Sequence, residues 1–599
     1  MYLDFKKGLK IRPVLSLLNP LLVLPYLASY NILPEKISPV LNTSSGWLLL
    51  MKSFNTSRLL TVLSVGILAA ACSDHKITPD NNTKVKNVIL MIGDGMGAQQ
   101  VGMLEEYVQR APNSVLSTKI TGLQKIADNG RVGLSITAPV GANPSLVVDS
   151  ACSATQLATG KGSISEAIGL DSQGNKVETI LEKAKSMGKA TGLVTDTRLT
   201  HATPAAFAAH QPHRRYENEI AEELLRTGVD VMLGGGARHW LPQDTANKKS
   251  EYAVALGGNT NVIKKSKRKD TRNLIQEARD QGYTLAFDKS QLATVENGKL
   301  LGLFDDSAMN DGIEYTGCQN GNTREKCQQE PSLTEMTLKA LDILSQDEDG
   351  FFLMIEGGQI DWAGHVNDAG WLLHEMLKFN EAIEAVYQWV KDRNDTLLVV
   401  TADHETGGFG FSYHKHNTPD AVQLPGDGMR GKDYQPQYNF GALNTLDKLY
   451  QQSRSFYDIY DAVNGNWDFS QASSAQWKQA VNESVHSDFQ ITDTDAVNIA
   501  ARTAAPADQI KPNHKYLKAK EIPLINDFKD FYVYAGDDQG VLISRAIASK
   551  QSVIWGTGTH TAAPVPVYAF GPTHVTEKFS TMQRHVDVGQ KLIDAFIVE

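Results

Sequence analysis

The stretch "VKNVILMIGDG" at residues 85–95 sets the fold class of this chain. A continuous apolar run ends in a glycine–aspartate–glycine turn, which is the pattern of a strand buried on both faces. Similar stretches recur along the chain: "KATGLVTDT" (189–197), "VDVMLGGG" (229–236), "FFLMIEGG" (351–358), "TLLVVTADH" (396–404) and "VPVYAFGP" (565–572). These stretches predict several strands of one buried sheet.

The segments between these strands have helical periodicity. The clearest case is an apolar series with spacings of 4, 3, 4, 3 and 4 residues: Leu372, Met376, Phe379, Ile383, Val386 and Val390. Such spacing places the apolar side chains on one stripe of a helix. Buried strands that alternate with amphipathic helices predict an α/β fold, a doubly wound and mostly parallel central sheet covered by helices on both faces.

Three of the predicted strands end in acidic residues. Asp94 follows the run that ends at Ile92, Glu356 follows Ile355, and Asp403 comes just after Thr401. Open parallel sheets bind their ligands beyond the carboxyl ends of the strands. One such acid could simply form a turn, but three of them beside glycines predict a functional site at this edge.

Composition excludes some classes of protein. The 599 residues are 41% hydrophobic and 21% charged, with a formal net charge of −10, as in a soluble globular protein. A negative chain has no global attraction for nucleic acid. The run "KKSKRK" (264–269) could contact nucleic acid, but it is isolated and lacks interleaved aromatics, which favours a solvated loop. No nucleic-acid-binding surface is therefore expected.

The pattern weakens between about residues 410 and 555, where the sequence is rich in Gln and Asn. We interpret this segment as a large insertion near the active edge, serving as a lid, a dimer arm or a surface crown. It belongs to a domain that spans residues 85–599. His414 and His416 lie in it and could line the pocket or bind a further ion, but a solvated loop is the simpler interpretation.

The N-terminal region resembles an export signal. Lys52 and Arg58 precede an apolar run of 13 residues, 59–71, which is too short to span a bilayer comfortably. The run ends "LAAAC", which resembles a bacterial lipobox with Cys72 as the lipidated residue. The alternative is an ordinary signal peptide with an incidental cysteine. We favour the lipoprotein, which implies a periplasmic or outer-membrane location in a Gram-negative cell and a membrane contact only through the lipid.

The remaining N-terminal segments follow from this signal. Residues 51–71 form the predicted signal peptide and residues 72–84 a polar linker. Residues 1–50 contain apolar patches broken by prolines and precede a complete signal. We therefore hypothesise that translation starts at Met51 and that residues 1–50 are a mis-assigned extension.

The cysteines are few enough to assign. Cys318 and Cys327 flank the polar loop "CQNGNTREKC", and in an oxidising compartment we expect them to form a disulfide. Cys152 would then be a free thiol. It could serve as a nucleophile, but a small buried apolar residue is the more common role.

Carboxylates and histidines suggest metal sites. Asp361 and His365 are four residues apart and share one face if a helix begins there; Asp403 and His404 share a turn; His560 lies in a glycine-rich loop. Mixed imidazole and carboxylate ligands suit zinc. The two sets suggest two zinc ions. Oxygen-rich surroundings, at Asp94, Thr203 and Glu356, would suit magnesium.

A possible nucleophile stands in "VVDSACSAT" (147–155), at the predicted opening of a helix. Ser150 could be an ordinary helix cap. Alternatively it is a nucleophile, which at neutral pH requires a base or a cation. No histidine is near it in sequence, so the alternatives here are a helix cap and a nucleophile that something other than histidine activates.

Several motifs, in order, resemble the alkaline phosphatase family: "VILMIGDGMG", "DSACSATQLATGKG", "HATPAAFAAHQPHRR", "EGGQIDWAGH", "TADHETGG" and "GTHT". The resemblance covers about residues 85–410 and 555–599. It implies one zinc held by Asp361, His365 and His560. It implies a second zinc held by Asp94, Asp403 and His404 and reached by Ser150, with Asp94 bridging to a magnesium completed by Thr203 and Glu356.

The resemblance also implies a reaction. Phosphate monoesters would be hydrolysed by two in-line displacements through a phosphoserine at Ser150, in a homodimer with two zinc ions and one magnesium per subunit. Arg214, oriented by Asp149, would hold two phosphoryl oxygens, with Arg215 as the neighbouring alternative. Two positions depart from the best-known bacterial pattern: His201 stands near the magnesium where an aspartate is usual, and Trp362 replaces a lysine.

Two other functions remain open at this stage. One is a phosphodiesterase, sulfatase or other ester hydrolase that uses the same metals. The arginine expected to hold two phosphoryl oxygens argues against diesters, and the motif that sulfatases modify is absent. The other is an inactive surface lipoprotein that binds metal or phosphate, against which stands the full set of expected ligands and the nucleophile.

Overall fold

The computed structural model describes residues 84–248, 265–501, 531–534 and 536–597, together with residues 256, 262 and 515. The predictions for residues 1–50, the signal peptide at 51–71 and the linker at 72–84 therefore lie outside the described residues, except for Lys84. Within the described part of the chain, every helix is too short or too polar to cross a membrane.

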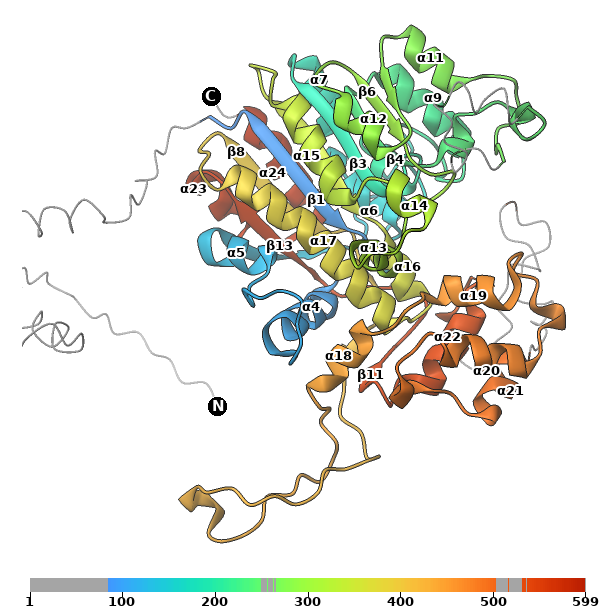
Figure 1. Cartoon of the computed structure of the whole chain (residues 1–599). Coiled ribbons are helices and arrows are strands. Elements are labelled where there is room, and N and C mark those ends of the chain that lie inside the picture. Colours follow the sequence, from blue (N-terminus) through green and yellow to red (C-terminus); the bar gives the residue numbers. More distant parts are fainter. Residues whose placement is uncertain are drawn as a thin grey trace, which may run out of the picture. The chain divides into compact units, whose positions relative to one another are not determined.

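A ten-stranded sheet forms the centre of the described region (Figure 1). The strand order is β14-β2-β13-β8-β1-β7-β3-β4-β6-β5. The six predicted strands are present as β1 (Asn87–Gly93), β3 (Ala190–Arg198), β4 (Val231–Gly235), β7 (Phe351–Gly357), β8 (Thr396–Ala402) and β13 (Val565–Phe570). Four strands were not predicted: β2 (Arg131–Ile136), β5 (Thr284–Ala286), β6 (Leu300–Leu303) and β14 (Met582–Arg584).

The sheet is mostly parallel, as predicted. Within the ten strands, β13 alone runs antiparallel to its neighbours β2 and β8. The central strand β1 pairs in parallel with β7 and β8, so that Ile92 lies beside both Glu356 and Thr401. The three strand ends that carry acidic residues therefore meet at one edge of the sheet.

Helices cover both faces of the sheet, because alternate residues of the buried strands face opposite sides. Ile89 and Met91 pack in one core with α4 (Ala98–Arg110), α15 (Leu333–Leu344) and α17 (Ala369–Val390). Val88 and Leu90 pack in a second core with α6 (Ser150–Thr159), α7 (Ile180–Ser186) and α24 (His585–Ile597). The doubly wound α/β prediction is confirmed (Figure 1).

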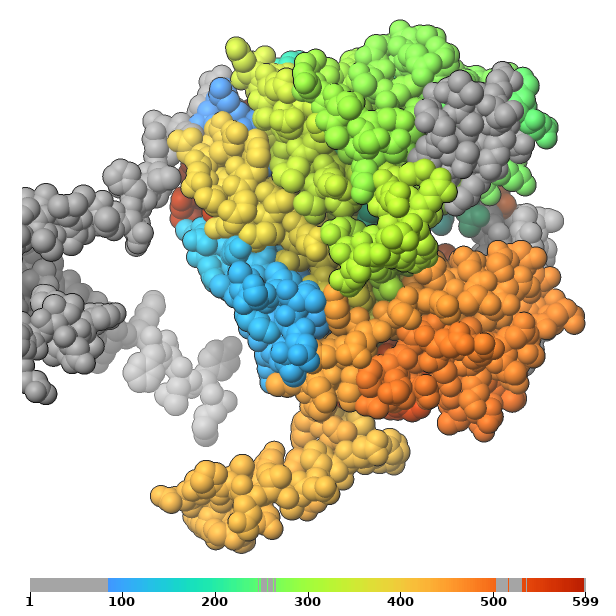
Figure 2. Space-filling model, viewed as in Figure 1, coloured from blue at the N-terminus to red at the C-terminus, as the bar shows by residue number. Residues whose placement is uncertain are grey.

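The segment predicted to be an insertion has two parts. Residues 412–443 form an arm with little regular structure that projects from the rest of the segment (Figure 2). Aromatic side chains of this arm are exposed, among them Tyr413 and Phe440. The second part contains helices α18 (Asn444–Tyr450), α19 (Phe456–Asn464), α20 (Ser474–Asn482), α21 (Asp493–Ala500) and α22 (Asp538–Ile547). His414 and His416 lie on the arm, outside the candidate site described below.

The basic run at 264–269 is only partly the solvated loop that the sequence predicts. Arg268 is fully buried and donates to Glu222 and Asp270, at 2.7 and 2.6 Å. It also donates to the carbonyl of His239. Arg268 is therefore a structural residue that ties this loop to its neighbours.

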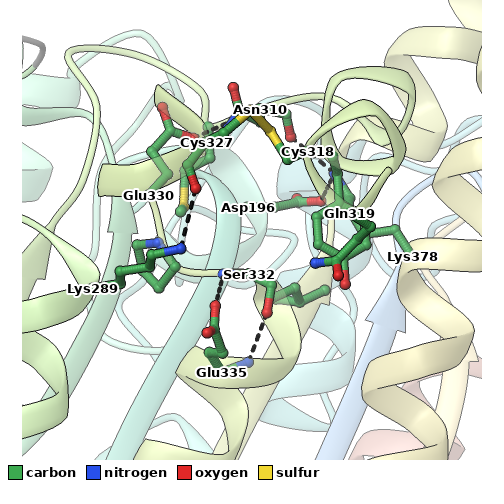
Figure 3. A pocket seen from close by; sticks show the side chains of 14 residues that line it. Asp196, Lys289, Asn310, Cys318, Gln319, Cys327, Glu330, Ser332, Glu335 and Lys378 are labelled. Atoms are coloured by element: carbon green, nitrogen blue, oxygen red, sulfur yellow. Dashed lines mark hydrogen bonds and ion pairs between the residues drawn. A yellow bond between two sulfur atoms is a disulfide. The ribbon is translucent and has the colours of Figure 1, made fainter. Parts of the chain in front are cut away.

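The predicted disulfide is present. Cys318 at the end of α13 (Gly312–Gln319) is bonded to Cys327 in α14 (Glu325–Gln329), beside a pocket shown in Figure 3. Cys152 is buried in α6, and burial raises the pKa of its thiol, which favours its packing role over a nucleophilic one.

Removing the disulfide should destabilise the protein by about 2–3 kcal/mol, because the cross-link restricts a short loop of the unfolded chain. The double variant Cys318→Ser, Cys327→Ser tests this by urea unfolding of oxidised protein. Reduced wild type should show the same loss, and reductant should leave the double variant unchanged. Equal unfolding free energies for oxidised wild type and the double variant would contradict the prediction.

Candidate active site

The turn after β1 begins the site. The backbone N–H of Asp94 donates to Gly357 at the end of β7, and that of Gly95 donates to Asp403 at 3.1 Å. Gly95 has a φ of +78°, and a Cβ there would lie 2.8 Å from both the Asp361 backbone and the Thr406 hydroxyl. Only glycine allows this close approach, which gathers the acidic residues.

Asp361, His365 and His560 form the first cluster. Asp361 and His365 share one face of α16 (Gln359–His365), as predicted, and lie 3.2 Å apart. Each histidine's Nδ1 contacts a backbone carbonyl, Gly558 for His365 and Val148 for His560. These contacts leave both Nε2 atoms as lone-pair donors, 3.3 Å apart and beside Asp361.

Asp94, Asp403 and His404 form the second cluster, and Ser150 joins it. His404 Nε2 lies 3.1 Å from the Ser150 hydroxyl, 3.1 Å from Asp403 Oδ2 and 3.4 Å from Asp94 Oδ1. His404 Nδ1 instead faces the Thr406 hydroxyl. In a serine–histidine–aspartate triad, the carboxylate would contact the nitrogen that faces away from the serine. Here one nitrogen faces the serine and both carboxylates, which fits a shared cation.

Unpaired carboxylate oxygens support the same interpretation. Asp94 Oδ1, Asp403 Oδ2 and Glu356 Oε1 are buried and make no hydrogen bond to the residues that the structure describes. Burial, with the neighbouring charges of Asp403, Asp361 and Glu356, raises the pKa of Asp94 well above its usual range. Burial also raises the pKa of Glu356, to about 8. Buried acids aimed at one point require cations or protons.

A third cluster contains Asp94, Glu356 and His201, whose ligand atoms all lie within 4.8 Å of one another. Glu356 Oε2 accepts hydrogen bonds from Thr195 and Thr197, so that its other oxygen faces the cluster. Thr203, in α8 (Ala202–Ala205), donates to Asp94 Oδ2 at 3.5 Å. The predicted oxygen ligands are thus brought together.

The hydrogen bonds and charges around His201 determine its protonation state in this cluster. Arg214 donates to His201 Nε2 at 3.2 Å, and burial together with Arg214 lowers the pKa of His201, so the ring is neutral. With Nε2 accepting, the proton resides on Nδ1. Nδ1 has no hydrogen-bond partner among the described residues. It is therefore a donor, suited to contact a cation's water rather than the cation.

Ser150 begins α6 and is buried. Asp149 caps this helix by accepting from the N–H groups of Ala151 and Cys152, and its carboxylate also contacts Arg214 at 3.1 Å. Burial alone would lower the pKa of Arg214, but Asp149 raises it above its ordinary value. Arg214 lines the same pocket as Ser150, as does the alternative Arg215, which is more exposed.

Sequence reasoning missed several residues of the pocket. The cavity in front of Ser150 has a volume of about 620 Å³. Its walls include residues without a predicted role: Arg198, Glu217, Arg238, Tyr457, Trp467, Tyr534 and Asp537. Trp362 also lines it, half-buried and edge-on to His201. Because the missed residues come from different strand ends and from the insertion, no local motif marks them.

The comparisons with known proteins agree with this geometry. A sequence model of the family described as alkaline phosphatase matches residues 85–525. The chain belongs to the alkaline phosphatase family. Alkaline phosphatase 3 of Bacillus subtilis is 31% identical over 538 residues, which cover 89% of this chain and 93% of the relative. Alkaline phosphatase 4 of the same organism is 33% identical over 362 residues, 58% of this chain and 68% of the relative.

Solved structures of other alkaline phosphatases are also similar to this chain. The cold-active alkaline phosphatase from a psychrophilic Shewanella has a TM-score of 0.59 and 27% identity, covering 85% of this chain and 99% of that one. The Thermus thermophilus alkaline phosphatase has a TM-score of 0.63 over 88% and 95% of the chains, with 23% identity, and supports the fold alone. The chain is therefore a phosphatase with an alkaline-phosphatase-like fold and candidate metal-ligand groups.

A buried lysine, Lys378, lines the pocket of Figure 3 together with Asp196. Lys378 of α17 contacts Asp196 at 3.0 Å, Glu375 at 2.7 Å and the Asn310 carbonyl. Asp196 in turn accepts a hydrogen bond from the N–H of Gly358, two residues beyond Glu356. Lys378 thereby neutralises two buried carboxylates and fixes the backbone that carries Glu356 and α16.

Replacing Lys378 by methionine should lower the unfolding free energy by about 3–5 kcal/mol at pH 8, because two buried carboxylates lose their counter-charge. Burial already raises the pKa of Glu375 to about 7. When folding raises the pKa of an acid, the unfolding free energy of the protein falls as the pH rises through the folded-state pKa. The loss should therefore be smaller at pH 6, as denaturant unfolding at both values would show.

Lys391→Met is the matched control for this variant. Lys391 pairs with Asp392 at 2.5 Å, but both side chains are exposed. Its loss should change the unfolding free energy far less than the loss of Lys378 does, because exposed ion pairs contribute little to stability. A Lys378→Met variant as stable as Lys391→Met, at either pH, would contradict the buried-charge argument.

Proposed function

We propose that this alkaline phosphatase hydrolyses phosphate monoesters to an alcohol and inorganic phosphate through a phosphoserine at Ser150, with two zinc ions and one magnesium per subunit. The observation that carries the proposal is His404 Nε2, which faces the Ser150 hydroxyl and one oxygen each of Asp94 and Asp403, neither of which accepts a hydrogen bond from the described residues. That arrangement serves a cation-activated serine rather than one activated by histidine.

The donor sets support the identity of the metals. Asp361, His365 and His560 form one mixed set and Asp94, Asp403 and His404 the other, which suits zinc. The oxygens of Asp94, Glu356 and Thr203 suit magnesium, with His201 as a donor to its water. When bound, the zinc ions would lower the pKa of the serine hydroxyl and stabilise the leaving oxygen.

The chain's own residues would carry the two displacements. The Ser150 oxygen attacks phosphorus as the ester P–O bond breaks, and the alcohol leaves with a proton. Arg214, oriented by Asp149, holds two non-bridging oxygens during this transfer. Water then attacks the phosphoserine from the vacated side, the Ser150 O–P bond breaks, and the serine recovers its proton as phosphate leaves.

Export and assembly are further proposals. We infer that the mature protein is an exported lipoprotein anchored at Cys72, on the basis of the signal-like segment at residues 51–71. We also infer a homodimer, which the exposed aromatic arm of residues 412–443 supports, because contiguous exposed apolar side chains mark interaction surfaces.

Replacing Ser150 by alanine should lower kcat for phenyl phosphate at least about 10³-fold, because it removes the hydroxyl proposed to accept the phosphoryl group. Chelation of the wild type should abolish activity, and zinc with magnesium should restore it. Brief acid quench with labelled substrate should leave a phosphoserine in the wild type alone. Full activity after complete removal of metal, or a labelled residue other than Ser150, would refute the mechanism.

Replacing Trp362 by lysine should strengthen inhibition by phosphate about three- to tenfold and slow turnover, because a positive charge beside the product delays its release. Inhibition constants and kcat for the wild type and the variant test this. Trp362→Gln is the control, since it removes the ring without adding charge. An unchanged inhibition constant in Trp362→Lys would contradict the charge argument.

A further inference from the structure

The cavity in front of Ser150 is larger than a phosphate group needs, and its outer walls are chemically distinct. Resting on the function proposed above, we infer that these walls form a leaving-group subsite for nucleotides that carry more than one phosphate. Arg238 and Arg215 would bind the phosphate that remains on the leaving group. Trp467 and Tyr534, from the segment predicted to be an insertion, would contact the aromatic base.

Neighbouring strands deliver the cationic wall. Arg198 is the last residue of β3, and Arg238 lies in η3 (Ala237–His239), directly after β4. Since β3 and β4 are parallel neighbours, both arginines reach the edge that holds the metal-ligand clusters. Together with Arg214 and Arg215 they place four guanidinium groups in one pocket.

These arginines differ in how their charge is balanced. Arg198 makes two hydrogen bonds to Glu217, of 2.7 and 3.2 Å, and Arg214 pairs with Asp149. Arg238, by contrast, is 3.9 Å from its nearest carboxylate partner, Asp306.

Two of the arginines remain available to an anion. Arg238 Nε is buried and makes no hydrogen bond to the residues that the structure describes. Burial and the like charge of Arg198 lower the pKa of Arg238. Arg215 is exposed and makes no ion pair within the described part of the chain. Such guanidinium groups bind phosphate through two parallel hydrogen bonds.

The aromatic wall comes from the segment predicted to be an insertion. Trp467 is 39% exposed, and its ring packs on Tyr457 at 4.9 Å and on Tyr460 at 5.2 Å. Its indole N–H donates to Asp461 at 2.7 Å. Tyr534 is 49% exposed and stands edge-on to His365 at 4.9 Å. Braced, accessible aromatic rings are the surfaces on which nucleobases stack.

The backbone of Trp467 has an uncommon conformation. Trp467 has a φ of +57°, in the left-handed region that large side chains rarely adopt. It is held there by packing and by the hydrogen bond from its own N–H to the carbonyl of Asn464. Backbone strain of this kind gathers at ligand-binding sites, where the surrounding structure imposes it.

The arginine wall and the aromatic wall together fit a nucleoside diphosphate as the substrate. The terminal phosphoryl group of a nucleoside diphosphate would be transferred to Ser150: the Ser150 O–P bond forms while the bridging O–P bond breaks. The nucleoside monophosphate leaves with that bond's electron pair and takes a proton from solvent. Its phosphate is one bridging oxygen away from the reacting phosphorus and would face the arginines, while its base would face the aromatic rings that line the same pocket.

Three substrates separate the two walls: ADP has a base and a second phosphate, AMP has only a base on the leaving group, and glycerol 2-phosphate has neither. We measure kcat/KM for each with the zinc- and magnesium-loaded enzyme. Arg238→Ala should lower the ratio of ADP to AMP about tenfold, the typical contribution of a charged hydrogen bond. Trp467→Ala should lower the ratios of both nucleotides to glycerol 2-phosphate about five- to tenfold.

Matched variants control for charge and folding. Arg110→Ala removes an equally positive but distant surface charge, paired with Glu106, and should leave all ratios unchanged. Trp467→Phe keeps an aromatic ring and should retain most of the nucleotide preference, and Arg238→Lys should retain part of it. Because ratios are compared within one variant, a general loss of stability does not imitate the result.

The outcomes distinguish the two proposals. Ratios that stay within twofold of the wild type in both Arg238→Ala and Trp467→Ala would overturn the subsite while leaving the proposed function intact. A wild type that releases phosphate from none of the three substrates, or a Ser150→Ala variant as active as the wild type, would instead overturn the proposed function.

Discussion

Repulsion between buried carboxylates at one sheet edge is the constraint on which the rest of the structure depends. Asp94, Glu356, Asp361 and Asp403 are fully or almost fully buried. Asp94 and Asp403 directly follow strands, Glu356 lies near the end of β7, and Asp361 lies in α16, which begins just after β7. In a low-dielectric interior such charges cannot share a site without compensation. Histidines compensate part of this charge: against the effect of burial, contacts with His365 and His404 lower the pKa values of Asp361 and Asp403. Asp94 and Glu356 have raised pKa values instead, which favours their protonation. Divalent cations provide better compensation, so metal binding and stability of this edge are coupled.

The buried acids are held in place by hydrogen bonds from residues that pack around them. Thr406 donates to Asp361, and His585 of the C-terminal helix α24 contacts the carbonyl of Asp403 with one ring nitrogen and the Ser135 hydroxyl with the other. Lys378 supports Glu356 indirectly, because it contacts Asp196, which accepts a hydrogen bond from the backbone N–H of Gly358. These contacts come from elements far apart in sequence, so the geometry of the edge depends on the complete fold. They restrict the ligands' orientation in the way that precise catalysis requires.

Much of the fold and of the site could be predicted because the relevant signals are local. Continuous apolar runs identify β1, β7 and β8, and the acids directly after them follow from parallel topology. The missed strands β5, β6 and β14 have only three or four residues, and β2 is half-exposed, so neither length nor burial distinguishes them. The reversed direction of β13 has no signature, since an apolar run reads the same in either orientation. Arg198 and Arg238 were missed because only the pairing of β3 with β4 brings them together, and no local sequence pattern shows that pairing.

Under the proposed function and the proposed leaving-group subsite, the site has two halves of different origin. The half that holds the phosphoryl group is built on the rigid edge of the sheet, from residues that belong to recognisable motifs. The half that faces the leaving group takes Trp467 and Tyr534 from the segment predicted to be an insertion, which can vary without disturbing the buried acids. A change in that segment would alter which alcohol is accepted, whereas a change at the sheet edge would abolish transfer itself. In these proposals reaction type and substrate choice are carried by separate parts of one chain: the first is inferred from local motifs, and the second from residues that only the fold brings together.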